Sequence, residues 1–176
     1  MADGDFKSAQ VSFDQASDLM PNLWTPYFKK GIVFGSQKEF KKAEQEYRKG
    51  LEIYPDHPSL LANYGATLAI LGEIEEAESP LRTAIRKSPN NHTAYNSLAQ
   101  VYLNQRKLDK AREMLSLAVK VNPKFGAGHA NLAMLYVMMN KYNIAKVHLR
   151  KALELGLRTT MTESLQKILQ NPLPKL

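Results

Sequence analysis

The sequence predicts an all-α protein, built as a superhelical solenoid of antiparallel helix pairs. The first observation is a period of 34 residues, which separates Pro21, Pro55, Pro89 and Pro123. The second is that columns of small and of bulky residues keep the same period, and the third is that apolar residues inside each period fall at helical spacing. Because one helix pair cannot bury its own apolar face, successive pairs must stack, and stacking produces a solenoid.

The repeated columns predict how the two helices of a period pack. Small residues recur at Gly31, Gly65, Ala99 and Ala133, and again at Ala9, Ala43, Ala77, Ala111 and Ala145. A third small column is Ala16, Gly50, Ala84, Ala118 and Ala152. Bulky residues recur at Phe34, Leu68, Tyr102 and Tyr136, and at Phe13, Tyr47, Leu81, Leu115 and Leu149. We expect the small residues to let paired helices approach closely while the bulky residues fill the space beside them.

The chain is expected to form one domain, residues 1–176, made of the following elements. Residues 6–19 match only the second helix of a preceding period, and the full periods are 24–57, 58–91, 92–125 and 126–157. In the second period the two helices are separated at Gly72, which can act as a C-cap, and Pro21, Pro55, Pro89 and Pro123 each follow a second helix and stop it. Because the chain opens in the middle of a period, we expect it to be a fragment of a larger protein.

Residues 160–170 are predicted to be a capping helix. Thr160-Met161-Thr162-Glu163 has the pattern of a capping box. Its apolar face is Met161, Leu165, Ile168 and Leu169. Polar residues between them would supply the polar outer face that the end of a solenoid needs.

This pattern of bulky, small and proline columns resembles the tetratricopeptide repeat family, which implies a right-handed superhelix. The resemblance covers most of the chain. Four positions depart from the family pattern: Lys30 stands where a bulky apolar residue is expected, Gly50 replaces a late alanine, His129 replaces the first bulky residue and Leu157 replaces the closing proline. These departures concern the packing of the first and last full periods.

Composition excludes several classes of function. The chain has no cysteine, so it has no disulfide or thiolate metal site, and no apolar run long enough for a membrane span. No signal peptide is visible at the start, and the cytoplasm is the default expectation. The net charge of +7 is uneven, since residues 1–100 carry 11 Lys/Arg and 13 Asp/Glu, whereas residues 101–176 carry 13 and 4.

No residue set in the sequence supports catalysis, a metal or a cofactor. The histidines His57, His92, His129 and His148 lack a metal-ligand spacing and are interpreted as solvated or core residues. The acidic cluster around Glu73 brackets the start of a helix, where the macrodipole favours negative charge. The sequence therefore predicts a protein that is not an enzyme.

The resemblance implies a ligand site on the concave face, at the second, fifth, sixth and ninth positions of each period. The first period presents Thr25, Phe28, Lys29 and Ile32, and the second presents Ser59, Ala62, Asn63 and Ala66. The third presents Thr93, Asn96, Ser97 and Gln100, and the fourth Ala127, Ala130, Asn131 and Met134.

Two modes of recognition known in the family can be compared with these residues. Co-chaperones of the family hold a chaperone's C-terminal carboxylate with lysine, asparagine and arginine side chains. Here Phe28 and Ile32 precede Asn63, and Thr93 and Ser97 follow it, so no carboxylate-clamp chaperone binding is expected. The second mode is an asparagine ladder, as in the O-linked N-acetylglucosamine transferase. Asn63 and Asn131 match its position, although asparagine is equally a default residue there.

The leading hypothesis is a protein-interaction scaffold or adaptor that binds a peptide segment of a partner protein in its concave groove. Phe28, Ile32 and Met134 would supply apolar contacts, and asparagines and Gln100 polar ones. The alternative uses the basic C-terminal half, which could meet an acidic partner, nucleic acid or an anionic membrane surface. Nucleic acid is disfavoured because no interleaved aromatic residues accompany the lysines.

Overall fold

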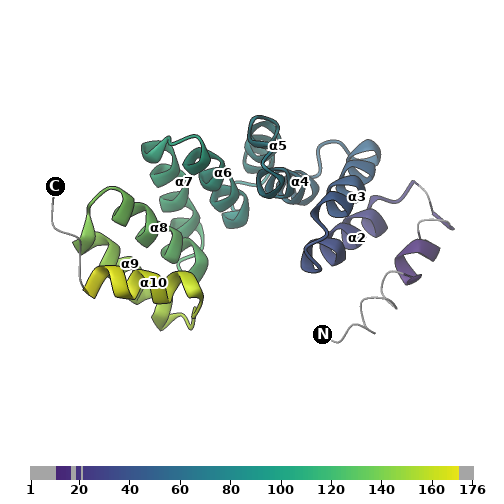
Figure 1. Cartoon of the computed structure of the whole chain (residues 1–176). Coiled ribbons are helices and arrows are strands. Elements are labelled where there is room, and N and C mark those ends of the chain that lie inside the picture. The colour runs from purple at the N-terminus through teal and green to yellow at the C-terminus, as the bar shows by residue number, and fades with distance from the viewer. Residues whose placement is uncertain (1–10, 17–18, 21, 171–176) are drawn as a thin grey trace. The chain divides into compact units, whose positions relative to one another are not determined.

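The computed structural model describes residues 11–16, 19–20 and 22–170, and all regular structure in these residues is α-helical (Figure 1). Residues 11–16 are helical, and the following helices are α2 (Trp24–Ser36), α3 (Phe40–Ile53), α4 (Pro58–Leu71), α5 (Ile74–Lys87), α6 (His92–Asn104), α7 (Leu108–Val121), α8 (Gly126–Met138), α9 (Tyr142–Glu154) and α10 (Thr160–Gln170). The predicted all-α class is confirmed. Residues 6–10 and 17–18 of the expected first helix lie outside the described residues.

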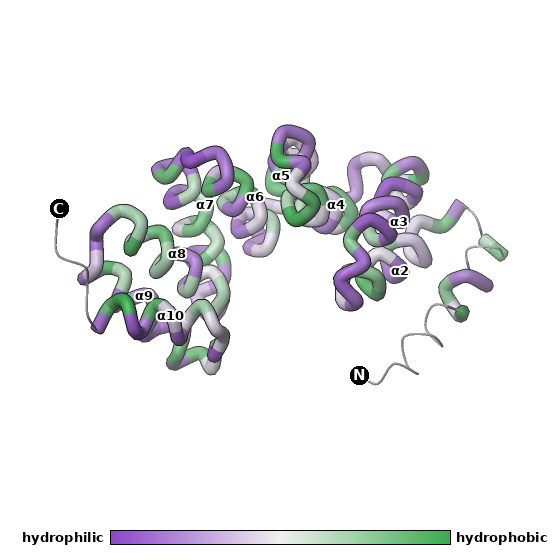
Figure 2. The backbone as a smooth tube through the Cα atoms, in the orientation of Figure 1, coloured by the Kyte–Doolittle hydropathy of each residue, from purple (hydrophilic) through white to green (hydrophobic). Residues whose placement is uncertain are grey.

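Each first helix packs against the second helix of the same period. The pairs are α2 with α3, α4 with α5, α6 with α7, and α8 with α9. The chain divides between Pro89 and Asn90 into an N-terminal and a C-terminal compact unit. Within each unit the pairs stack through α3 on α4 and α7 on α8, respectively. Every labelled helix carries both hydrophobic and hydrophilic residues, as expected of amphipathic helices (Figure 2).

The small and bulky columns meet inside these helix pairs. A Cβ added at Gly31 would lie 2.4 Å from the Tyr47 ring, and one at Gly65 would lie 2.7 Å from Leu81 Cγ. Ala133 and Leu149 lie in one buried cluster of α8, α9 and α10. Tyr47 and Leu81 are 3% and 0% exposed, so the space opposite each small residue is filled. Close packing of this kind explains why the columns keep their phase.

The turn between the two helices of a period has the same backbone conformation in all four full periods. Lys38, Gly72, Arg106 and Asn140, which are 34 residues apart, have φ of 62°, 86°, 57° and 57°. The next amide donates to the carbonyl of the bulky column, as in Lys107 N to Tyr102 O at 2.8 Å. This is the 6→1 bond of a Schellman motif, and it satisfies carbonyls at the helix end. The predicted Gly72 cap is confirmed.

Two of the departures from the repeat pattern have a local explanation. Lys30 Nζ lies 2.7 Å from Asp14 and 3.4 Å from the buried Glu46. Burial opposes the charge of Lys30, but hydrogen bonds and attraction to these carboxylates outweigh it and raise its pKa. A Cβ at Gly50 would lie 2.9 Å from a methyl group of the fully buried Leu60, so leucine fills the space that alanine would occupy.

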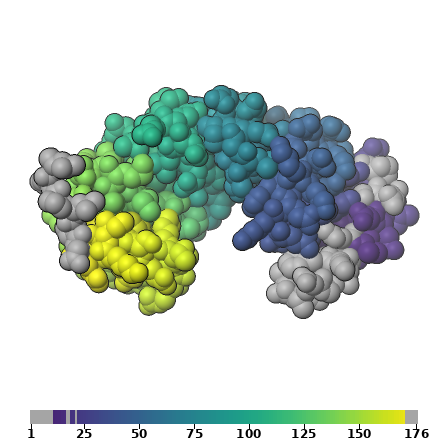
Figure 3. Space-filling model, in the orientation of Figure 1, coloured from purple at the N-terminus to yellow at the C-terminus, as the bar shows by residue number. Residues whose placement is uncertain are grey.

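The capping helix α10 packs on α8 and α9 (Figure 3, yellow on green). Its buried residues include Leu165 and Leu169, while Ile168, predicted for the same face, is 37% exposed. The capping box predicted from Thr160 to Glu163 begins one residue earlier in the structure, at Thr159. Thr159 precedes the helix, its Oγ1 accepts from Thr162 N, and Thr162 Oγ1 accepts from Thr159 N. Thr162, rather than Glu163, therefore closes the reciprocal cap.

Candidate functional site

The residues predicted for the ligand site all lie on first helices, where positions two, five, six and nine share a face. Lys29 and Ile32 are exposed. The half-buried ones are Thr25, Phe28, Asn63, Ala66, Asn96, Ser97, Gln100, Asn131 and Met134. The resemblance also implies that Ala62 and Ala130 face a ligand, and this prediction is wrong, because the two residues are only 5% and 0% exposed. At these two positions, the small side chain is enclosed by neighbouring helices instead of facing a ligand.

Two predicted site residues of the C-terminal unit are brought together. Asn131 Nδ2 on α8 donates to Asn96 Oδ1 on α6 across 2.7 Å, and both side chains are half-buried. This bond leaves the amide NH₂ of Asn96 and the amide oxygen of Asn131 without another hydrogen bond among the described residues. The two repeats thus present one locked donor and one locked acceptor side by side.

The asparagine of the N-terminal unit behaves differently. Asn63 Nδ2 donates to the carbonyl of Ser59 within α4 at 2.9 Å, so one of its donors is turned back on its own helix. Phe28, on α2, packs its ring 5.8 Å from Trp24 and 6.2 Å from Tyr47, and lies against the core of the unit. Asn63 and Asn131, which the sequence presents as equivalent, are therefore not equivalent.

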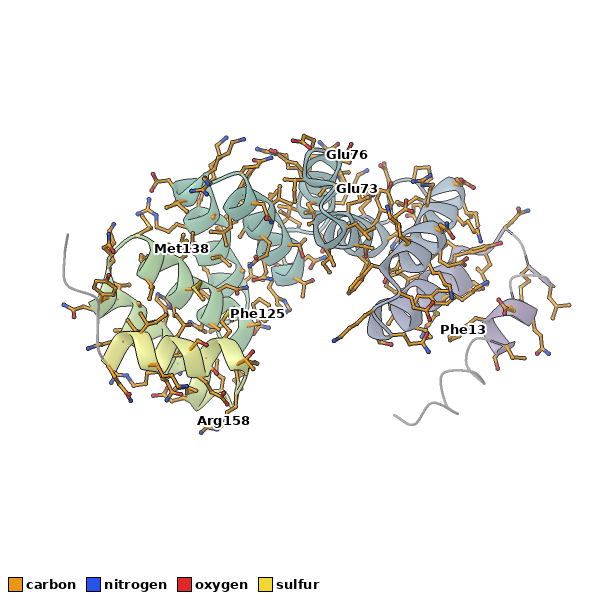
Figure 4. The ribbon with its side chains drawn as sticks, in the orientation of Figure 1. Phe13, Glu73, Glu76, Phe125, Met138 and Arg158 are labelled. Carbon is orange, nitrogen blue, oxygen red and sulfur yellow. The ribbon has the colours of Figure 1, made fainter. Side chains whose placement is uncertain are left out.

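Two ring contacts join the first residue of a first helix to the residue just before the next first helix, and the repeated columns do not predict them. The ring centroids of Trp24 and His57 are 3.8 Å apart, with the rings tilted by 36°. The ring centroids of His92 and Phe125 are 4.7 Å apart, and Phe125, labelled in Figure 4, precedes α8. Both pairs are 33 residues apart. His57 Nδ1 also accepts from Leu60 N at 3.4 Å, capping α4, and burial lowers the pKa of His57. His57 and His92 thus make packing contacts at the turns that precede first helices.

A pair of histidines lies between α8 and α9. His129 Nε2 is 3.1 Å from the carbonyl of Pro123, and His129 Nδ1 is 3.1 Å from His148 Nδ1. Since a carbonyl only accepts, His129 carries its proton on Nε2, and His148 Nδ1–H donates to His129 Nδ1. The ring centroids are 5.4 Å apart, and the ring planes are inclined by 27°.

The surroundings of His148 favour its neutral form. Burial lowers the pKa of His148, and the facing His129 lowers it further. In the described part of the chain, no group of three or more His, Asp or Glu side chains is placed to hold a metal ion. No described helix is both long and apolar enough to cross a membrane.

Models of one family match the sequence. Models described as tetratricopeptide repeat match residues 25–57, 46–79, 68–135 and 130–159, which together cover residues 25–159. No curated protein sequence gives a match.

Solved structures show the same fold at low sequence identity. A structure of PilF from Pseudomonas aeruginosa has a TM-score of 0.81 and 23% identity, covering 96% of this chain and 78% of its own. MamA from Desulfovibrio magneticus RS-1 has a TM-score of 0.75 and 23% identity, covering 87% and 86%. YrrB, described as a tetratricopeptide repeat protein with an unusual peptide-binding site, has a TM-score of 0.70 and 20% identity, covering 93% and 84%.

The repeat period, the paired helices and the matching family models all agree. The tetratricopeptide fold is a non-catalytic scaffold, and proteins that have it bind protein or peptide partners. The chain belongs to the tetratricopeptide repeat family and is a protein-interaction scaffold.

Proposed function

We propose that the first-helix face of α6 and α8 binds an extended segment of a partner protein. The observation that carries this proposal is the 2.7 Å hydrogen bond between Asn131 and Asn96. An extended peptide offers one N–H and one C=O per residue, and these need partners when they leave water. Asn131 Oδ1 can accept the N–H, and the Asn96 amide can donate to the C=O.

The bond between the two amides favours binding because it fixes their orientation before the ligand arrives. Each long polar side chain that must be ordered on binding costs roughly 0.5–1.5 kcal/mol, and a side chain already held costs less. A site that reads backbone groups also makes little demand on the ligand sequence. This fits a scaffold whose site presents amides and no clamp of charged residues.

Neighbouring residues would complete the contact. The half-buried Met134 follows Asn131 by one helical turn and offers an adaptable thioether, while Ser97 and Gln100 add polar groups on α6. On the N-terminal unit, the exposed Ile32 and Lys29 with Thr25 and Phe28 on α2, and Ala66 and Asn63 on α4, form the corresponding face. We expect weaker backbone recognition there, because Asn63 already donates to Ser59.

The proposal is tested with peptides selected from a random displayed library against the full chain. The tightest peptide is labelled with fluorescein, and its dissociation constant is measured by anisotropy for the wild type and for Asn96→Ala/Asn131→Ala. Loss of two hydrogen bonds of about 0.5–1.5 kcal/mol each predicts a weakening of roughly 5- to 150-fold. The matched control is Asn143→Ala, the same change at an exposed position of α9.

Circular dichroism establishes that each variant keeps its helices. Equal affinity of the wild type and the folded double variant for every selected peptide would refute the proposal. Side-chain amide signals of Asn96 and Asn131 in nuclear magnetic resonance spectra should shift on peptide addition, whereas the Asn143 signal should not.

A further inference from the structure

The two units balance their charges differently. Residues 22–89 hold ten Lys/Arg and nine Asp/Glu, and ion pairs such as Lys41–Glu73 at 2.5 Å and Lys87–Asp56 at 2.6 Å link their helices and turns. Residues 90–170 hold twelve Lys/Arg and four Asp/Glu. Ion pairs within that range, as far as the structure describes it, are Arg112–Asp109 and Lys151–Glu154. Residues 90–170 therefore have more basic side chains than acidic side chains that could pair with them.

Part of this excess charge borders a hollow on the second helices. The hollow lies between α7 and α9, and its apolar lining is Val119, Pro123 and Val147. Arg150 and Lys151 line it as well, together with one carboxylate, Glu154. Lys151 and Glu154 are 3.5 Å apart and both exposed, and exposed pairs contribute at most about 1 kcal/mol, so a ligand carboxylate can compete with Glu154.

Arg150 is exposed and forms no ion pair with any described residue. Its guanidinium can therefore donate two hydrogen bonds to a carboxylate in the two-point geometry that arginine favours. Beside it, Val147 is 54% exposed, and Ile144 on the same helix is 43% exposed. His129 and His148 also line the hollow, and burial lowers the pKa of His148, which disfavours its charged form.

We propose that this second-helix face of α7 and α9 binds an acidic segment of a partner protein. Carboxylates of the segment pair with Arg150 and Lys151, and an apolar side chain of the segment lies between Val119 and Val147. The amides of Asn96 and Asn131 lie on α6 and α8. The residues that this proposal uses, Val119, Val147, Arg150 and Lys151, lie on α7 and α9. The two proposals therefore stand or fail independently.

The chemistry of this face favours an acidic protein over a nucleic acid. Single strands are held by aromatic side chains on which bases stack, with lysine and arginine along the backbone. Tyr142 is the one Phe, Trp or Tyr residue in the sequences of α7 and α9, and it packs partly buried against the core of α8, α9 and α10. An apolar lining beside an arginine suits a leucine-type side chain followed or preceded by a carboxylate.

The test uses the full chain at pH 7.5 in 150 mM salt. The probe is a fluorescein-labelled peptide of Glu-Glu-Leu-Glu repeated three times, and a second peptide has serine in place of each leucine. The critical pair of variants is Arg150→Gln and Arg158→Gln, which remove the same charge from two exposed arginines without an ion pair among the described residues (Figure 4 labels Arg158). Anisotropy gives the dissociation constants.

We expect Arg150→Gln to weaken the leucine peptide about fivefold or more, and Arg158→Gln to weaken it less than about twofold. Val147→Ser, at an exposed position, should weaken the leucine peptide and leave the serine peptide unchanged. Equal losses for the two arginine variants would mean diffuse attraction and overturn the proposal. So would serine and leucine peptides that bind equally well.

Two further polyanions separate the other sources of negative charge. A 20-nucleotide poly(dT) strand and vesicles of phosphatidylserine and phosphatidylcholine are tested against the same variants. Tighter binding of either one than of the leucine peptide, with the loss confined to Arg150→Gln, would replace the acidic segment by a nucleic acid or a membrane surface. We expect weak binding of both, with equal losses for the two variants.

Discussion

Replacing Gly31 with alanine tests the contact between the small and bulky columns directly. The new Cβ would lie 2.4, 2.7 and 2.7 Å from three atoms of the Tyr47 ring. Real Cβ atoms do not approach other heavy atoms this closely, so the ring must move. Tyr47 is 3% exposed and packs with Ala43 and Leu60, which are fully buried, so its ring has little room to move.

The magnitude follows from two opposing effects. Overpacking a filled core costs typically about 1–3 kcal/mol, and three ring atoms in conflict place this site in the upper part of that range. Alanine also favours the helix over glycine by about 0.8–1.0 kcal/mol. We therefore expect Gly31→Ala to lower the free energy of unfolding by roughly 1–2 kcal/mol. On the same helix, Gly35 has open space around its Cβ position, so Gly35→Ala should raise it by about 0.5–1 kcal/mol.

Urea unfolding followed by tryptophan fluorescence measures both effects. Trp24 is the single tryptophan and lies on α2 with Gly31 and Gly35, so it reports the unit that is changed even when repeats unfold separately. Tyr47→Leu supplies a second test, because Ala133 is paired with Leu149 in the fourth period. In the Tyr47→Leu background, Gly31→Ala should destabilise less than it does in the wild type.

Equal effects of Gly31→Ala and Gly35→Ala would refute this reasoning. A double-mutant cycle in which Gly31→Ala and Tyr47→Leu simply add would refute it as well, since residues in contact should couple by about 0.5–3 kcal/mol. Helix content by circular dichroism should be the same in the wild type, the two single variants Gly31→Ala and Tyr47→Leu, and the double variant.

Two further outcomes follow from the histidines and the turns. The pKa of His148 is lowered in the folded chain, so below about pH 6.5 the unfolded chain binds more protons and stability falls as pH decreases. Urea midpoints at pH 7.5, 6.5 and 5.5 should fall in that order, with a smaller decrease for His148→Gln, and level midpoints would contradict this. Arg106 has φ of 57°, where a side chain is strained, so Arg106→Gly should raise stability by about 0.5–1 kcal/mol in urea unfolding, and Asn140→Gly by less. A loss of stability for Arg106→Gly would show that its turn is not strained.

The sequence alone determined the all-α class, the family and the residues that form the packing columns. The 34-residue period arises because the same packing requirement recurs in each repeat. Examples are the close approach of Gly31 to Tyr47 and of Gly65 to Leu81. Equivalent environments select equivalent residues, and the pattern is therefore visible in the sequence. The positive φ of the turns could be predicted only at Gly72, because glycine favours positive φ. Lys38 and Arg106 also have positive φ, but their residue types do not predict it.

The tertiary structure alone decided how individual polar side chains are used. Asn63 and Asn131 occupy the same column, yet one donates to its own helix and the other to Asn96 in the neighbouring repeat. An amide can make either bond, and the choice depends on which groups the next helix brings within 3 Å, which no local pattern encodes. The same holds for His129 and His148, which are 19 residues apart and become a pair only because α8 and α9 pack together.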